Sequence, residues 1–151
     1  IHKKAIFYNY SKSKYFKEFF GFFEKIYSKK INYLLELDME IIYYLIKCLN
    51  INTEIIFSSE LKITQMKSDR NLEICKKLNA DIYIAGAHAH ETNYLKLEDF
   101  KNNNITVDFQ NFQHPAYQQC YEPFIPNMST IDLIFNMGKQ SSKILIDAKN
   151  I

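Results

Sequence analysis

Tryptophan is absent from this chain of 151 residues, and glycine, proline and cysteine each occur only three times. With so few glycines there is no glycine-rich phosphate loop, which excludes the P-loop and dinucleotide-binding motifs. The cysteines lack the paired spacing of a zinc ribbon. No Ser–His–Asp order of a hydrolase triad is present either. The common sequence signatures of catalysis are therefore missing.

The three cysteines, Cys48, Cys75 and Cys120, are odd in number and far apart. Cys48 and Cys75 fall in apolar helical patterns, so we expect buried free thiols in a reducing, cytoplasmic compartment. No uninterrupted apolar run of about 18 residues occurs, so we expect no membrane span. We likewise expect no signal peptide.

The excess of positive charge is small, because 19 lysine and arginine residues face 17 acidic residues, the net charge is only +2 and no arginine-rich cluster exists. We therefore expect no nucleic-acid partner. Hydrophobic residues make up 47% and aromatic residues 15% of the chain, which is enough to bury a core and argues against disorder. The length predicts one domain over residues 1–151. The chain begins at Ile1, not at a methionine, and its first ten residues, IHKKAIFYNY, are strand-like. We therefore expect a piece of a longer protein.

The first half predicts a pair of helices. Over residues 11–28, aromatic side chains recur at spacings of three and four, with Ser11 or Ser13 available as a cap and Gly21 as the weak point. Residues 31–49 carry a broad apolar face. An aromatic stripe of this kind is compatible with a ligand site, but core packing is the favoured interpretation.

From residue 50 the hydrophobic period changes. We predict buried strands at 53–57, 81–85 and 105–109, a helix capped by Ser68 that runs to about residue 78, and a short helix at 95–101. Strands that alternate with helices are typical of a parallel sheet, and strands apolar on both faces call for helices on both sides. The prediction is an α/β fold: a partial Rossmann-like, three-layer fold with a mostly parallel sheet and an N-terminal helical pair.

Ligands of open parallel sheets bind beyond the C-terminal ends of the strands. Three loops fit that position here, at 58–60 (Ser58, Ser59 and Glu60), 86–93 and 111–121. All three are rich in hydroxyls, amides or imidazoles. We therefore predict that they share one substrate pocket.

The second loop begins at Gly86, which allows a turn and a close approach of a ligand phosphate. His88 and His90 could share a metal ion with Glu91. Two solvated histidines are the favoured interpretation, because a metal site needs a firmer spacing, and we expect no metal.

The third loop holds His114, Tyr117 and Gln118. An imidazole that titrates near neutral pH can act as a general base toward an amine or a hydroxyl. A histidine that only holds the loop in shape is an equally good interpretation, and the sequence leaves both open.

The segment after this loop predicts a helix with Ser129 as its N-cap and Gly138 at its end. In a capping box, the Asp132 side chain would accept a hydrogen bond from the backbone N–H of Ser129. This structural interpretation is favoured over catalysis for both Ser129 and Asp132. The exposed N–H groups at the helix start could still bind an anion.

The stretch from His114 to Gly138, HPAYQQCYEPFIPNMSTIDLIFNMG, resembles the C-terminal signature of the WbqC-like family. Weaker agreement extends over 58–61 (SSEL) and 70–83 (RNLEICKKLNADIY). Two departures stand out: AHAHETN precedes Tyr94 where the family has a short Lys/Asp-containing turn, and the family's N-terminal His/Gln-Pro segment has no counterpart. The resemblance implies that this chain is the C-terminal part of a WbqC-like domain.

The resemblance further implies a role in bacterial surface polysaccharide (O-antigen) biosynthesis. We expect acyl or aminoacyl transfer to a nucleotide-activated amino sugar, so the partners would be a sugar nucleotide and an acyl donor. His114 would take the amine proton, Tyr117 and Gln118 would orient the sugar, and Asn127 with the helix start at Ser129 would hold an anionic group. The remaining candidate substrate-binding residues are Ser58, Ser59, Gly86 and Asp132.

Two other classes of function stay open. One is a nucleotidyl or glycosyl transferase on the same scaffold, because a fold does not choose its chemistry. The other is a non-catalytic protein that binds a sugar or a partner enzyme. Enzyme activity is thus not settled by the sequence, and no cofactor is indicated.

Overall fold

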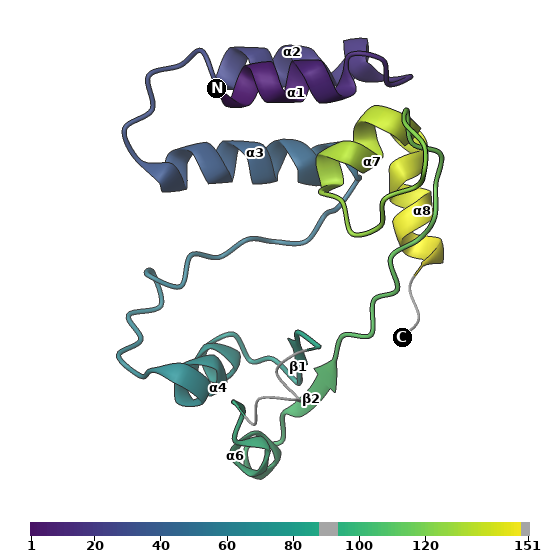
Figure 1. Ribbon diagram of the computed structural model, residues 1–151. Helices are drawn as coiled ribbons and strands as arrows, with labels where there is room; N and C mark the ends of the chain where they lie inside the picture. The colour runs from purple at the N-terminus through teal and green to yellow at the C-terminus, as the bar shows by residue number, and fades with distance from the viewer. Residues whose placement is uncertain (88–93, 149–151) are drawn as a thin grey trace. The chain divides into compact units, whose positions relative to one another are not determined.

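A computed structural model describes residues 1–87 and 94–148 of the chain (Figure 1). The chain divides into two compact units. The first comprises Ile1–Thr53 and the described part of Gln113–Lys149, and the second comprises Glu54–Phe112. Together they contain helices and a small parallel sheet, which confirms the predicted α/β class.

In the described residues of the first unit, all regular secondary structure is helical. Its helices are α1 (His2–Tyr10), α2 (Phe16–Ile26), α3 (Leu34–Cys48), α7 (Thr130–Met137), the short 3₁₀ helix η1 (Gly138–Gln140) and α8 (Ser141–Asp147). The predicted helical pair is therefore present as α2 and α3, with α1 placed before it.

Helix α1 corrects the prediction for the first ten residues, which are not a strand. Ile6 and Tyr10 lie four residues apart, one helical turn, and both are buried in the core of the first unit. Ser11 follows the last residue of α1, and α2 begins only after Tyr15, without a side-chain cap. The helix predicted over 11–28 is therefore present but shorter, from Phe16 to Ile26, and the prediction of a serine cap at its start is wrong.

Aromatic rings form the core of the first unit. Phe23 of α2 and Phe135 of α7 are 1% and 0% exposed, and their ring centroids lie 5.6 Å apart. Phe16 and Phe19 pack against the same ring of Phe135. The aromatic stripe of α2 is thus core, as the favoured interpretation predicted.

Helix α3 confirms the helix predicted over 31–49, but its apolar face is less buried than predicted. Leu34 and Leu35 are 70% and 61% exposed. The C-terminal half of α3 makes the contacts with the core: Tyr44 stacks on Phe22 with ring centroids 3.7 Å apart. Leu49, just after the helix, is buried.

The second unit contains the sheet. Its elements are α4 (Lys67–Lys77), β1 (Ile82–Ala85), α6 (Leu97–Asn102) and β2 (Thr106–Phe109). The two strands are parallel, in a register that pairs Ile82 with Thr106 and Ala85 with Phe109. These elements confirm the helices and strands predicted from residue 68 to 109.

The sheet is smaller and more open than predicted. Residues 53–57 have no regular secondary structure, so the first of the three predicted strands is wrong. Along β1 burial alternates, with Ala85 2% exposed and Ile84 70% exposed. Only one face of β1 is therefore buried among the described residues, against the prediction of cover on both faces. The buried face packs on Phe100 of α6, which is fully buried.

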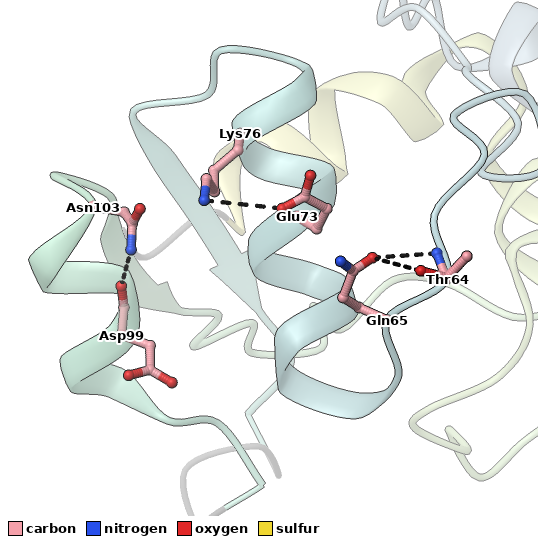
Figure 2. Close-up of polar contacts among 6 residues, drawn as sticks. All are labelled: Thr64, Gln65, Glu73, Lys76, Asp99 and Asn103. Carbon is pink, nitrogen blue, oxygen red and sulfur yellow. Dashed lines mark hydrogen bonds and ion pairs between the residues drawn. The ribbon is translucent and has the colours of Figure 1, made fainter.

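Polar side chains in the second unit make both longer-range and local contacts, and Lys96 pairs with Asp69 at 2.8 Å. Met66, and not Ser68, precedes α4; the Ser68 hydroxyl instead accepts a bond of 3.0 Å from the backbone N–H of Lys96. Figure 2 shows three further short-range contacts, within the pairs Thr64–Gln65, Glu73–Lys76 and Asp99–Asn103. Such contacts fix helix ends and turns but build no site.

None of the described helices is long and apolar enough to cross a membrane. The three cysteines carry free thiols; Cys75 is buried as predicted, and Cys48 is half-buried.

Candidate functional site

A buried carboxylate at the start of α7 is the centre of the candidate site. Ser129 precedes the helix as predicted, but its side chain makes no capping bond. Asp132 is 5% exposed, and its Oδ2 accepts hydrogen bonds from the Tyr117 hydroxyl at 2.8 Å and from Nε2 of Gln119 at 3.0 Å. The prediction that Asp132 closes a capping box is therefore wrong, because its carboxylate serves the neighbouring loop instead.

The Gln119 side chain also holds the loop that follows it. Its Nε2 donates to the carbonyl of Ile125 at 2.9 Å, and its Oε1 accepts from the N–H of Ile125 at 2.8 Å. A single amide thus closes the turn and supports the carboxylate of Asp132. The position of that carboxylate is fixed from the loop side as well as from the helix.

Tyr117 lies in a small group of rings. Its ring centroid is 5.8 Å from that of His114 and 5.5 Å from that of Phe124, and all three side chains are half-buried. The structure therefore brings two of the predicted residues, His114 and Tyr117, next to each other. Tyr117 is the one that reaches Asp132.

A second phenol faces the same carboxylate from α1. Burial, followed by the charge and a hydrogen bond of Asp132, raises the pKa of Tyr10 far above its ordinary value. Burial and the hydrogen bond to Asp132 raise the pKa of Tyr117 in the same way. Both hydroxyls consequently stay protonated into the alkaline range, where an ordinary phenol ionises, and remain donors toward the carboxylate.

A cavity of about 260 Å³ opens beside Asp132, entirely within the first unit. Its lining combines a carboxylate, two phenols, two amides and a thiol with apolar side chains: Asn9, Tyr10, Gln119, Cys120, Tyr121, Ile125, Met128 and Asp132. An apolar hollow with a few convergent polar groups is the usual form of a small-molecule site. The carboxylate is suited to accept hydrogen bonds from an ammonium group or from sugar hydroxyls.

Gln118 faces a different cavity. This second hollow, of about 250 Å³, is lined by Lys12, Lys14, Gln118, Gln119, Cys120 and Asn136. The two cavities share Gln119 and Cys120 in their linings and therefore adjoin.

Asn127 and Ser129 are both exposed and stand at the entrance of α7. Asn127 has a left-handed backbone with φ of 60°, a conformation that asparagine tolerates better than most residues. Neither residue is in the lining of the two cavities. Their predicted role in holding an anion stays a prediction.

The other predicted residues belong to the second unit. Ser58 accepts a hydrogen bond of 3.1 Å from Nη2 of Arg70, and Ser59 and Gly86 are exposed. That these residues share a pocket with His114 stays a prediction, because they lie in the unit described separately. His88, His90 and Glu91 fall outside the described residues. Within the described ranges, no group of three histidine, cysteine or acidic side chains is placed to hold a metal ion.

The sequence interpretation missed Tyr10 and Gln119. Tyr10 lies in the strand-like run of the first ten residues, which hides its helical spacing from Ile6. Gln119 could have been found from its alternation with Tyr117, since both side chains of an extended segment then point to the same side.

Comparison with known proteins identifies the family. The family described as the WbqC-like protein family matches residues 1–144, nearly the whole chain. This chain belongs to the WbqC-like protein family. The resemblance seen in the sequence is thereby confirmed, and the match begins at the first residue.

A curated relative extends the comparison. The protein named "Uncharacterized protein Rv1507c" of Mycobacterium tuberculosis (strain ATCC 25618 / H37Rv) is 25% identical over 146 residues. The aligned region covers 95% of this chain and 62% of that relative, so the chain spans less than two thirds of the relative's length. No solved structure matches this WbqC-like chain.

Proposed function

We propose that this WbqC-like chain acts in bacterial surface polysaccharide (O-antigen) biosynthesis, as a transferase of an acyl or aminoacyl group to a nucleotide-activated amino sugar. The observation that carries the proposal is the buried carboxylate of Asp132 in the wall of a cavity of about 260 Å³. A carboxylate held by a phenol and an amide is a ready acceptor for the amine of such a sugar.

The proposed reaction forms one bond and breaks one. The amine nitrogen attacks the acyl carbonyl carbon, the new C–N bond forms, and the bond from the acyl group to its carrier breaks. The amine gives up a proton, and the carrier leaves as an anion that takes a proton. A base near the amine is therefore required.

Asp132 is our choice for the group that binds the amine and accepts its proton, because it lines the cavity. Tyr117 and Gln119 are positioning residues, since both act through hydrogen bonds to the Asp132 carboxylate. His114 was the base expected from the sequence. In the present proposal it supports the ring of Tyr117, and the experiment below separates the two assignments.

The test uses UDP-glucosamine and UDP-glucose, two sugar nucleotides that differ by one amine in place of one hydroxyl. Calorimetry should show that UDP-glucosamine binds about 10-fold or more tightly, because the amine gains a charge-assisted bond to Asp132. The isosteric variant Asp132→Asn should lose that preference. Asp147→Asn, which removes an exposed carboxylate of α8 in the same unit, is the matched control.

Transfer from an acyl-coenzyme A to UDP-glucosamine, followed by mass spectrometry, tests the base. We expect Asp132→Asn to lower turnover by about 10²-fold or more and His114→Ala to lower it much less. The opposite ranking would return the role of base to His114. Release of UDP without acylation would instead indicate a glycosyl transferase and would contradict the proposal.

A further inference from the structure

The second cavity of the first unit has a chemical character of its own. Its lining includes two lysines, Lys12 and Lys14, together with Gln118 and Asn136. The Nζ of Lys14 lies 5.2 Å from the ring centroid of Tyr15. Asn136 uses its Nδ2 within α7, where it donates to the carbonyl of Asp132 at 2.8 Å. The cavity is thus lined by two cations and by polar groups, without a carboxylate.

The two lysines are presented by a well-anchored turn. Ser13, which lies between them in the sequence, is buried, whereas both lysines are exposed. Backbone bonds hold the turn, from the N–H of Ser13 to the carbonyl of Tyr10 at 2.8 Å and from the N–H of Tyr15 to the carbonyl of Phe135 at 2.9 Å. Both lysines therefore project from a short segment that is fixed to α1 and α7.

Neither lysine is neutralised by the part of the chain that the structure describes. The ion pairs among those residues involve other cations, and neither Lys12 nor Lys14 has a carboxylate within pairing distance. Lys12 instead places its Nζ 5.9 Å from the ring centroid of Tyr121, a residue of the cavity beside Asp132. Two uncompensated cations at one hollow attract a ligand with more than one negative charge.

The position of this hollow narrows the choice of ligand. It adjoins the cavity of Asp132 through the shared residues Gln119 and Cys120. In an activated sugar, the diphosphate is bonded directly to the sugar carbon. A sugar held at Asp132 therefore carries its diphosphate into an adjoining space. The start of α7 is a poorer place for that group, because its first turn already holds the Asp132 carboxylate.

We infer that Lys12 and Lys14, with Gln118 and Asn136, form a diphosphate subsite that continues the cavity of Asp132. The inference deepens the proposed function and rests on it for the identity of the sugar. The diphosphate can belong to a nucleotide or to a lipid carrier, since the same two phosphates occur in both.

The experiment measures binding of three probes by calorimetry at an ionic strength of about 0.15 M: inorganic pyrophosphate, UDP and geranyl diphosphate. The double variant Lys12→Ala/Lys14→Ala removes both cations, and Lys17→Ala/Lys25→Ala is the control. Lys17 and Lys25 are exposed residues of α2 in the same unit, so the change in net charge is identical. Thermal melting of both double variants checks that the fold is kept.

The wild-type protein should bind pyrophosphate, and the Lys12/Lys14 double variant should bind it about 10-fold or more weakly. The control should change affinity by less than about twofold, because exposed charges outside the cavity are screened. Binding of UDP supports a nucleotide as the source of the diphosphate. Binding of geranyl diphosphate in place of UDP supports the same subsite with a lipid carrier.

The inference is overturned if the wild-type protein binds none of the three probes, or if both double variants weaken binding equally. Asp132→Asn separates this outcome from failure of the proposed function. If the subsite is real, that variant binds pyrophosphate at least as tightly as the wild type, whether or not it alters the preference for an amine.

Discussion

At the scale of single residues, the site depends on one carboxylate and its donors. Asp132 lies in the first turn of a helix, where a negative charge is favourable, and is nearly excluded from water. A buried charge needs compensating hydrogen bonds, which Tyr117 and Gln119 provide. The arrangement therefore both stabilises the carboxylate and fixes its direction at the cavity.

The raised pKa values of Tyr10 and Tyr117 predict the response of stability to alkaline pH. Both phenols keep their protons in the folded state, whereas in the unfolded chain they ionise near pH 10. These groups therefore stabilise the fold fully below about pH 10, and their contribution is lost as the pH rises above it. Urea unfolding across this range should show a falling free energy of unfolding.

The double variant Tyr10→Phe/Tyr117→Phe should flatten this alkaline decline but not remove it. Burial also raises the pKa of Tyr44, which remains in the variant. Tyr8→Phe, which alters an exposed phenol, should leave the decline as it is in the wild type. An unchanged slope in the double variant would show that these two phenols ionise alike in the folded and unfolded chain.

The sequence identified several residues of the site but not their contacts. His114, Tyr117 and Asp132 were all chosen, yet Asp132 was interpreted as a capping residue. The reason is physical: the bond from Tyr117 to Asp132 joins residues 15 apart through a loop, which no helical spacing predicts. A capping box is a local pattern and is therefore the first explanation that a sequence offers.

At the scale of elements, local patterns predicted most helices and two of three strands. The failure at 53–57 has a clear reason, since β-branched residues favour a strand only where a neighbouring strand supplies hydrogen bonds. The failure at 1–10 is of another kind. Two lysines and several aromatic residues obscured the spacing of Ile6 and Tyr10 that marks a helix.

Two glycines give a matched prediction at this scale. Gly138 ends α7 with φ of 57°, and a Cβ there would lie 2.6 Å from Cδ1 of Tyr15. Gly21 lies within α2, and a Cβ there would meet no atom within 4 Å. Gly138→Ala should lower the free energy of unfolding by about 1–3 kcal/mol. Gly21→Ala should raise it by about 0.5–1 kcal/mol, because alanine favours the helix.

Chemical denaturation of the two alanine variants would measure these changes. If Gly138→Ala proved as stable as the wild type, the close contact between the end of α7 and the Tyr15 ring would be wrong. The sequence had marked both glycines, one as a helix end and one as a weak point. Only the structure shows that Gly138 lies against another side chain, the ring of Tyr15, and that Gly21 does not.

At the scale of the whole molecule, the chain has two compact units, each with a core of its own. The candidate cavities that involve Asp132 and Lys12 lie within the first unit. Composition alone predicts one domain for a chain of this length. The division into units depends on contacts between residues 1–53 and residues 113–148. These two segments are distant in the sequence, so no local sequence pattern indicates that they pack together.

Because each unit has its own core, we expect each unit to unfold locally without the other. Phe100→Ala removes a fully buried ring from the second unit. This change should lower the free energy of unfolding of that unit by about 3–5 kcal/mol. Hydrogen exchange should then speed up across α4, β1 and β2, while protection in α2 and α7 should stay near the wild-type level. Ile84→Ala, which alters a side chain that is 70% exposed, is the control. Equal loss of protection in both units after Phe100→Ala would contradict two independent cores.

A crystal structure of the protein with UDP-glucosamine bound would test the central claim most directly. We predict that the sugar amine lies within hydrogen-bond distance of the Asp132 carboxylate, about 2.7–3.2 Å, with the diphosphate against Lys12 and Lys14. A ligand bound elsewhere, with Asp132 still held only by Tyr117 and Gln119, would contradict the account.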